Sequence, residues 1–327
     1  WDGWDIAEEV ATVRTEVSEE KPRKIITRNT SPDISFDRSI NPYRGCEHGC
    51  IYCFARPTHA YLGLSPGRDF ETRLGARPEA ATVLERELRS ERYRPEVIAI
   101  GTNTDPYQPI EGRYRIMRQI LEVLLEYRHP VGVVTKGTLI ERDADILGEM
   151  GRLGLAHVGI TVTTLDTTVS RKMEPRVRLP ARRLETIRRL SEAGCPVRIM
   201  VSPVVPALTD HELEAILRAG VEAGAVAASW VMLRLPREVA PLFEEWVTDA
   251  FPDRASRVMN RVKELHGGKT YDPAWGTRMT GQGVFANMMR HRFEIERKRL
   301  GLDHSLAPLR TDLFLRPPRD GDQLELF

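Results

Sequence analysis

The 327-residue sequence predicts an α/β protein whose core is a partial (β/α)6 TIM-type barrel. Short runs of β-branched residues alternate with helical patterns, which indicates parallel strands joined by right-handed crossovers. The expected strands lie near residues 34–43, 97–100, 131–135, 158–162, 197–201 and 229–233. Six strands suit a partial barrel better than a closed barrel of about eight.

The segments between these strands carry helix signals. Ile116, Ile120 and Leu124 repeat on one helical face, and Gly194 is a natural stop for the helix before it. Residues 209–212 read as a capping box in front of another helix.

The barrel pattern covers only part of the chain. We expect residues 1–33 to form an N-terminal extension and residues 34–265 to form the barrel. Glycines interrupt the pattern after residue 266, so residues 266–315 are expected to be a C-terminal helical extension. Residues 316–327 are rich in Pro and Asp at their start and predict a flexible tail.

The composition narrows the function classes. Lys and Arg total 48 against 47 Asp and Glu, so attraction to nucleic acid would have to be local. No apolar run is long enough to span a bilayer, and the acidic start lacks the apolar core of a signal peptide, so no membrane partner is expected. With four cysteines, three of them clustered, a disulfide framework is excluded and a metal site in a reducing cytoplasm is indicated.

The cysteine cluster comprises Cys46, Cys50 and Cys53, with Gly45 and Gly49 allowing a tight loop. Three thiolates can hold three irons of a four-iron cube and leave the fourth iron open to an outside ligand. The alternative is a structural zinc site, which needs a fourth protein ligand. His59 is the better candidate for that ligand, because His48 lies inside the loop.

This C-x3-C-x2-C pattern, with Tyr52 before the last cysteine, resembles the signature of the radical S-adenosylmethionine (radical SAM) superfamily. Residues 41–46, 101–109 and 135–136 are similar to its spore-photoproduct-lyase-like branch. The resemblance implies a [4Fe–4S] cluster on the three cysteines, with S-adenosylmethionine chelating the open iron. Reductive cleavage then gives a 5′-deoxyadenosyl radical that abstracts hydrogen from the substrate. It also implies an electron donor such as flavodoxin or ferredoxin.

Further site residues are expected at the carboxyl ends of the strands, where parallel barrels place their chemistry. The resemblance implies that the loop after the second strand contacts the methionine amino group. Asp105 is a candidate acceptor for that ammonium, and Lys136 for pairing with the carboxylate. The full set of expected cofactor-binding residues is Tyr52, Thr104, Asp105, Lys136, Thr163 and Ser202. The alternative for each is loop or capping duty.

Lys136 and Tyr107 are the expected catalytic residues. Tyr107 is a candidate hydrogen donor, because the fourth cysteine, Cys195, precedes the fifth strand and is expected to pack on the structural face.

Two segments suggest partners. The basic stretch from Arg171 to Arg189 begins after the fourth rim loop and predicts contact with DNA or another nucleic acid; its alternative is a solvated helix face. The segment from Gln323 to Phe327 resembles the Q-L-x-L-F peptide that docks on the β sliding clamp; its alternative is a segment folded on the protein itself.

We therefore predict a cytoplasmic, lyase-like radical SAM enzyme that acts on nucleic acid, as in DNA repair. Two alternatives remain open: radical chemistry on a protein or small molecule, and a non-catalytic iron–sulfur protein associated with DNA or the clamp.

Overall fold

The computed structural model describes residues 14–303 and 306–318, and its centre is a seven-stranded sheet. The strand order is β10-β9-β8-β7-β6-β3-β2. Neighbouring strands from β3 to β10 are parallel, and β2 pairs antiparallel with β3. The bounds are β2 Thr27–Arg28, β3 Arg38–Ile40, β6 Ile98–Ile100, β7 Val131–Thr135, β8 Ala156–Thr161, β9 Val197–Val204 and β10 Ala227–Met232. The predicted parallel strands are thus confirmed, in the predicted order.

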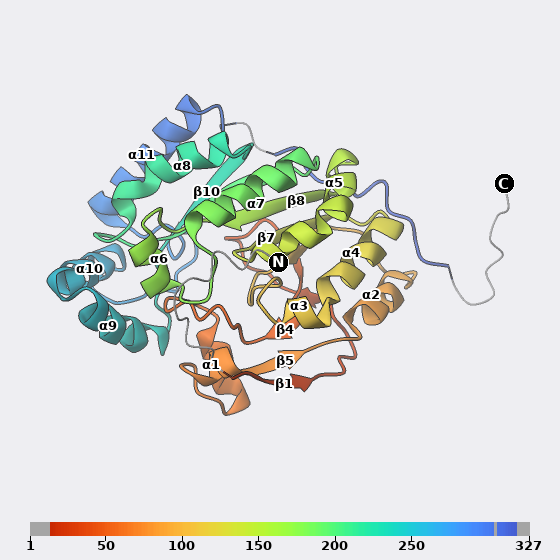
Figure 1. Ribbon diagram of the computed structural model, residues 1–327, viewed down its shortest axis with the longest axis horizontal. Helices are drawn as coiled ribbons and strands as arrows, with labels where there is room; N and C mark the ends of the chain where they lie inside the picture. The colour runs from red at the N-terminus through yellow and green to blue at the C-terminus, as the bar shows by residue number, and fades with distance from the viewer. Residues whose placement is uncertain (1–13, 304–305, 319–327) are drawn as a thin grey trace.

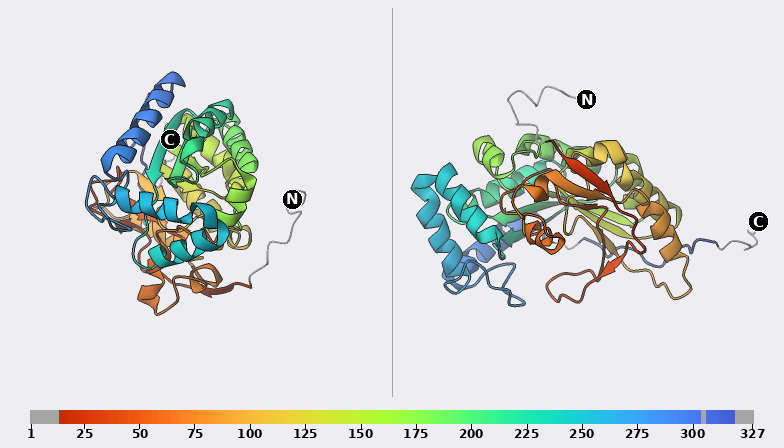
Figure 2. Two further views of the ribbon diagram at one scale, coloured as in Figure 1. Left: turned by 90° about the vertical axis from the view of Figure 1, so that its left-hand side faces the viewer. Right: turned by 90° about the horizontal axis from the view of Figure 1, so that it is seen from below.

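Helices follow the strands along the outer face of this sheet (Figures 1 and 2). The longer ones are α2 Ala80–Leu88, α4 Ile116–Glu126, α5 Ala144–Arg152, α7 Pro180–Glu192, α8 Leu213–Glu222 and α11 Gly283–Arg299. The short helices are α1 Asp69–Thr72, α3 Glu111–Tyr114 and α6 Thr167–Met173. A pair formed by α9 Val239–Ala250 and α10 Pro252–Leu265 lies at the opposite end of the molecule from α2 (Figure 1). No helix among the described residues is both long and apolar enough to cross a membrane.

The two faces of the sheet differ in how tightly they are covered. In β9, Val197, Ile199 and Val201 are fully buried, and a Cβ at Gly220 of α8 would lie 2.8 Å from Ile199. The alternate residues Arg198, Met200 and Ser202 point to the inner face and keep part of their surface exposed. The barrel is therefore packed on its outside and less tightly filled on its inside.

Both terminal segments are tied to the body more closely than the sequence indicated. Strands β1 Glu16–Glu19, β5 Arg73–Ala76 and β4 Tyr43–Arg44 form a second, three-stranded sheet, in the order β1-β5-β4. Near the other end, Leu315 donates its N–H to the Tyr127 carbonyl at 2.9 Å, and the Arg316 guanidinium bonds the Ser90 carbonyl. Arg316, at the expected start of the tail, is thus held against the body of the protein.

The predicted capping box is wrong. The Glu212 carboxylate accepts from the Thr164 hydroxyl and the Leu165 N–H, both at 2.6 Å, instead of capping α8. The Thr209 hydroxyl accepts the Val205 N–H at 2.9 Å. Tertiary contacts outcompete the local cap, and the result ties the loop after β8 to the loop after β9.

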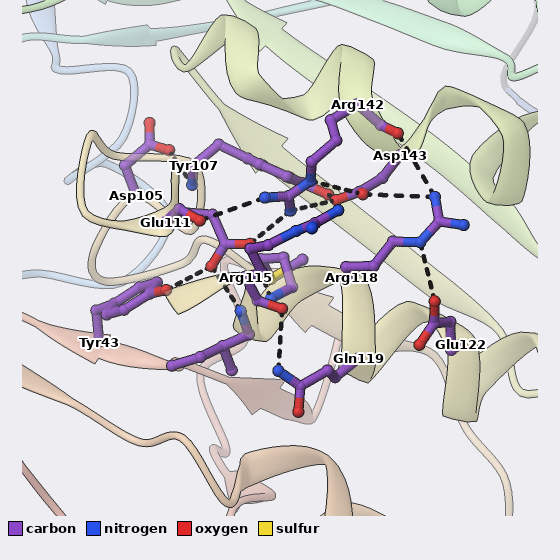
Figure 3. A network of polar contacts seen from close by, with 12 residues as sticks. Tyr43, Asp105, Tyr107, Glu111, Arg115, Arg118, Gln119, Glu122, Arg142 and Asp143 are labelled. Atoms are coloured by element: carbon purple, nitrogen blue, oxygen red, sulfur yellow. Dashed lines mark hydrogen bonds and ion pairs between the residues drawn. The ribbon is translucent and has the colours of Figure 1, made fainter. Parts of the chain in front are cut away.

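A buried polar network joins the loops after β6 and β7 to strand β4 (Figure 3). The Glu111 carboxylate accepts the Tyr43 hydroxyl, the Arg142 guanidinium at 2.6 Å and the Ile116 N–H at 3.0 Å. Arg142 also bonds Asp143 at 2.8 Å, and both carboxylates are fully buried. Because β4 leads directly into the cysteine loop, this network fixes the base of that loop.

Replacing Glu111 by glutamine is expected to lower the free energy of unfolding by about 2–3 kcal/mol, because it removes the charge of a fully buried carboxylate that pairs with Arg142. Urea unfolding would measure the change. Glu122→Gln is the matched control, since Glu122 bonds Arg118 at the surface and its loss should cost less than about 0.5 kcal/mol. Equal effects of the two variants would contradict a stabilising role for the network.

Candidate functional site

The cysteine loop follows β4 and crosses the carboxyl ends of the strands. Cys46 and Cys50 are buried, and Cys53 keeps part of its surface exposed. Gly45 and Gly49 have φ of +71° and +66°, so both adopt the left-handed conformation that glycine favours. A Cβ at Gly49 would also overlap the Arg176 guanidinium. The tight loop predicted from these glycines is confirmed.

Arg56, which is only 1% exposed, supports the backbone of this loop. Its guanidinium donates to the Cys50 carbonyl at 2.9 Å and the Gly49 carbonyl at 3.1 Å. It also donates to the carbonyls of Pro66 and Gly67 at 3.1 and 3.0 Å. One buried side chain therefore fixes the backbone between two of the cysteines.

Glu71 and Arg176 complete this support. Glu71 pairs with Arg56 through one oxygen and with Arg176 through the other. Arg176 donates from its side chain to the Glu47 carbonyl and from its backbone to the His48 carbonyl. We call Arg56, Glu71 and Arg176 the loop brace. No sequence pattern pointed to it, because its members come from three separate segments.

Burial disfavours the free thiolates of Cys46 and Cys50. Burial raises the pKa of Cys50 to about 12, although the Lys136 charge opposes this shift. Burial, and the negative charges of Asp105, Cys50 and Cys53, raise the pKa of Cys46 as well. Such thiols ionise at neutral pH only when a metal replaces the proton.

Lys136 lies beside this cluster of thiols, with its ammonium 5.7 Å from the centroid of the Tyr52 ring. Burial opposes its charge, but the negative charges of Cys50 and Glu174 raise its pKa, so Lys136 stays protonated at neutral pH. Within residues 14–303 and 306–318 its side chain makes no hydrogen bond or ion pair. Three N–H donors are thus available to an anionic ligand next to the cysteines.

The Tyr52 hydroxyl is anchored by a buried ion pair. Its hydroxyl donates to Glu174, and Glu174 pairs with Arg183 at 2.7 Å, with neither partner of that pair exposed. Arg183 also donates to the Thr161 carbonyl at 2.9 Å. The predicted role of Tyr52 narrows accordingly: its ring faces Lys136, while its hydroxyl is committed to Glu174.

Asp105 and Thr104 have partners that differ from those expected. The Asp105 carboxylate accepts the Thr135 hydroxyl at 2.5 Å, the Lys136 N–H at 2.7 Å and the Tyr107 N–H at 2.9 Å. Burial would raise its pKa, but the His48 charge and these bonds lower it to about 2. Thr104 donates to the Tyr43 carbonyl at 2.9 Å. Both residues therefore join loops, and the contact of Asp105 with a cofactor ammonium stays a prediction.

Tyr107 points away from the cysteines. Its hydroxyl donates to Asp143 at 3.0 Å within the buried network (Figure 3). Burial raises its pKa, as does the negative charge of Asp143. The structure thus gives Tyr107 a partner in this network, and its role as a hydrogen donor stays a prediction. Cys195 is buried just before β9, at the end of the barrel opposite the cysteine loop, where packing was expected.

The remaining predicted cofactor residues lie on the inner side of the strand ends. Thr163 is fully buried beside the Glu174 carboxylate. The Ser202 hydroxyl is buried and has no hydrogen-bond partner in the described part of the chain. Ser202 therefore keeps a donor free for a ligand.

The donor set fits an iron–sulfur cluster better than zinc. Among the described residues, no group of three or more His, Cys, Asp or Glu side chains is placed to hold a single metal ion. Each candidate for a fourth zinc ligand has one ring nitrogen engaged, since His48 Nδ1 lies 3.4 Å from Asp105 and His59 Nε2 contacts the Arg73 carbonyl at 2.9 Å. His59 Nδ1 is buried without a partner in the described residues. Three soft donors on one loop, without a fourth, suit a cube with one open iron.

Arginines stacked on exposed aromatic rings surround the outer side of the cysteine loop. Arg234 lies 4.6 Å from the ring centroid of Phe54, Arg237 5.6 Å from that of Tyr61, and Arg278 4.2 Å from that of Trp275. The three rings are 45%, 73% and 58% exposed, respectively. We call these six residues the arginine–aromatic rim.

The rim lies beside the end of β10. The Met232 N–H donates to the Met279 carbonyl at 2.8 Å, which brings the Trp275–Arg278 segment next to this strand. Burial lowers the pKa of Arg234, and the nearby charges that act on it include those of Arg278 and Cys53. Arg234 and Arg237 have no acidic partner within the described ranges.

The basic stretch from Arg171 to Arg189 is largely neutralised. Its members Arg176, Arg182, Arg183, Arg188 and Arg189 all form ion pairs with glutamates. Only Arg171 and Arg178, among its arginines, lack an ion pair to a described residue. The sequence thus overstated the charge that this stretch presents. The segment from Gln323 to Phe327 lies outside the described residues.

Comparison with known proteins agrees with this geometry. The family model of the radical SAM superfamily matches residues 40–219. An uncharacterised protein of Mycobacterium tuberculosis is 36% identical over 288 residues, covering 87% of this chain and 81% of that protein. A protein of Methanocaldococcus jannaschii is 24% identical over 199 residues, covering 61% of this chain and 71% of its own length.

Solved structures share the fold. Spore photoproduct lyase complexed with dinucleoside spore photoproduct has a TM-score of 0.60 at 14% identity, over 87% of this chain and 79% of that one. A variant of the same enzyme has a TM-score of 0.63 at 13% identity, over 88% and 80% of the two chains.

Proposed function

Because this chain belongs to the radical SAM superfamily, and is thus an enzyme that uses a [4Fe–4S] cluster and S-adenosylmethionine, we propose that its substrate is a nucleic acid. The proposed reaction is hydrogen abstraction from a base or lesion, as in DNA repair.

The residues around the cluster have distinct roles in this proposal. Cys46, Cys50 and Cys53 would hold the cluster, and the loop brace keeps their backbone in place. When bound, the cluster supplies the electron for reductive cleavage of S-adenosylmethionine. Lys136 would donate hydrogen bonds to the carboxylate of that cofactor, because its ammonium is charged and has no hydrogen-bond partner among the described residues. Ser202 offers a further donor from β9.

The arginine–aromatic rim is the observation that carries the choice of substrate. Exposed rings offer stacking surfaces to bases, and the guanidiniums of Arg234 and Arg237, which form no ion pair with a described residue, attract phosphates, whereas Arg278 pairs with Asp33. Rings and cations together are typical of sites for single-stranded nucleic acid. Phe54 is adjacent in sequence to Cys53, so a strand bound at the rim lies next to the cluster. Spore photoproduct lyase, which shares the fold, has been solved with a dinucleoside lesion bound.

The incompletely filled inner face suits a base removed from its stack. A reacting base must leave a duplex before it can approach the cluster, and extrusion is easiest for damaged or unpaired bases. The rim would hold the strand while the extruded base points inward.

Removal of one rim aromatic is expected to weaken binding of a single-stranded oligonucleotide. Trp275→Ala should cost about 1–3 kcal/mol, because each stacked base loses its ring platform. Arg237→Gln should weaken binding and reduce the slope of log K against log salt by about 1. Fluorescence anisotropy at several salt concentrations measures both effects.

Arg188→Gln is the matched control, because Arg188 is exposed but paired with Glu185 at 2.6 Å. Its binding should equal that of the wild type. If Arg188→Gln weakens binding as much as Arg237→Gln, the strand lies along the basic stretch and not on the rim.

Activity tests the proposal directly. Irradiated DNA should stimulate formation of 5′-deoxyadenosine by the reconstituted protein, and undamaged duplex DNA should not. Stimulation by peptides or small molecules, without a response to any nucleic acid, would contradict the proposal.

Two further parts of the proposal follow from the cofactor. Radical SAM enzymes need an electron donor, and we infer a flavodoxin or ferredoxin for this role. We also assign the protein to the cytoplasm, where its four free cysteines would stay reduced.

A further inference from the structure

The inner face of β9 and β10 carries polar atoms that the protein leaves without partners. The described residues provide no hydrogen-bond partner for Arg198 Nε, Ser202 Oγ or Ser229 Oγ, or for His157 Nδ1 on β8. Registered pairs of parallel strands point to the same side, so Ser229 shares the face of Met200, and Met200 that of Arg198. Four unpartnered polar groups on one wall point to a polar ligand or water at that place.

Of these four groups, Arg198 is the one whose positive charge most requires a partner. Its registered neighbours are Gly159 on β8 and Ala227 on β10, neither of which can supply a counter-charge. No ion pair joins it to any residue within 14–303 or 306–318. Burial lowers its pKa, which shows that its charge is partly desolvated. A guanidinium in this condition is stabilised most by an anion that accepts both of its parallel N–H bonds.

His157 is a suitable neighbour for such an anion. Burial and the positive charge of Arg198 lower its pKa to about 4, so the imidazole is neutral at pH 7. Neutral histidine donates one N–H without adding a second desolvated charge. A Cβ at Gly132 would lie 3.0 Å from His157 Nε2, so the glycine makes room for the ring.

We propose that Arg198 and His157 form a receptor for a phosphate group of the substrate. The receptor rests on the proposed function only in naming phosphate as the anion. Arg198 precedes Ser202 by four residues on one strand, which places its backbone about 13 Å from that of Ser202 and further still from Val204 at the rim end of β9. The receptor therefore binds the substrate far from the reacting atoms. Binding energy at that place orients the substrate without acting on the chemical step.

Chemical modification of the full-length protein tests the receptor without any activity. Phenylglyoxal reacts with accessible arginines, and peptide mass spectrometry reports the rate at each one. Inorganic phosphate at three times its Kd should slow modification of Arg198 about fourfold, by mass action. Acetate at the same ionic strength should protect it less. The rate at Arg178, which also lacks an ion pair to a described residue, is the internal control and should not change.

Three variants exclude a folding artefact. Arg198→Lys keeps the positive charge but loses the planar guanidinium with its two parallel N–H donors. Phosphate should therefore bind to this variant at least fivefold more weakly, as measured by calorimetry. Arg178→Gln should bind phosphate as the wild type does. His157→Gln keeps a donor and should retain most of the affinity. No protection of Arg198, or equal protection of Arg178, would overturn the receptor.

The outcomes separate this receptor from the proposed function. If phosphate protects Arg198 but no oligonucleotide binds at the rim, the receptor stands and the nucleic-acid substrate does not. If oligonucleotides bind at the rim and phosphate leaves Arg198 unprotected, the receptor fails and the proposed function stands.

Discussion

Cys50→Ala is expected to abolish cluster assembly. Anaerobic reconstitution of the wild type should give about four irons per chain with the brown colour of a [4Fe–4S] centre, and the variant should give less than about one. The reason is that each of the three thiols on the loop serves one iron, and the remaining cysteine, Cys195, lies far from the loop, just before β9. Cleavage of S-adenosylmethionine should fall to background.

Cys195→Ala is the matched control, because Cys195 is buried before β9 and belongs to no metal site. It should retain full iron content. Iron uptake by the wild type should also fall as the pH is lowered, since burial raises the pKa of Cys50 to about 12 and the metal must displace its proton. Full iron in Cys50→Ala, or loss of iron in Cys195→Ala, would place the cluster elsewhere.

Arg56→Met is expected to have the second largest effect. The substitution leaves the carbonyls of Gly49, Cys50, Pro66 and Gly67 without their guanidinium donor and removes one partner of Glu71. Breaking a buried pair of this kind costs about 3–5 kcal/mol. The cluster should also become labile, because the loop that holds it loses its preformed backbone.

Urea unfolding of the unloaded protein and the rate of iron loss to a chelator measure the two parts of this effect. Arg56→Lys should restore charge but not the planar fork, and so should recover little of either. Arg73→Met is the control, since Arg73 is half-exposed and its ion pair with Glu16 is 3.7 Å long. A stable Arg56→Met variant with normal iron retention would show that the loop is held by its own backbone alone.

Local sequence patterns predicted the fold and the cluster ligands. Strand order and helix placement follow from alternating β-branched runs, and the cysteine loop follows from its spacing and its two glycines. These signals are local, because each depends on residues close together in the chain. The capping box at Thr209–Glu212 failed for the same reason: Glu212 has better partners after β8, which a local pattern does not contain.

Asp105 and Tyr107 show that a position at the carboxyl end of a strand does not predict the contacts of the side chain. Both follow β6 at the expected end of the barrel, yet Asp105 binds the start of the loop after β7, and Tyr107 binds Asp143. Strand position fixes the end of the barrel at which a residue lies. It does not fix whether the side chain turns toward the cysteines or into a neighbouring loop.

The sequence alone therefore determined the superfamily, the barrel and the three thiols, since these depend on short spacings that survive in any context. Only the tertiary structure decided which charges remain available. It neutralised most of the stretch from Arg171 to Arg189, placed Arg56 against the cysteine loop and left Arg198 and Lys136 without an ion pair to a described residue. Charge pairing joins residues that are distant in sequence, so its outcome exists only once the chain has folded.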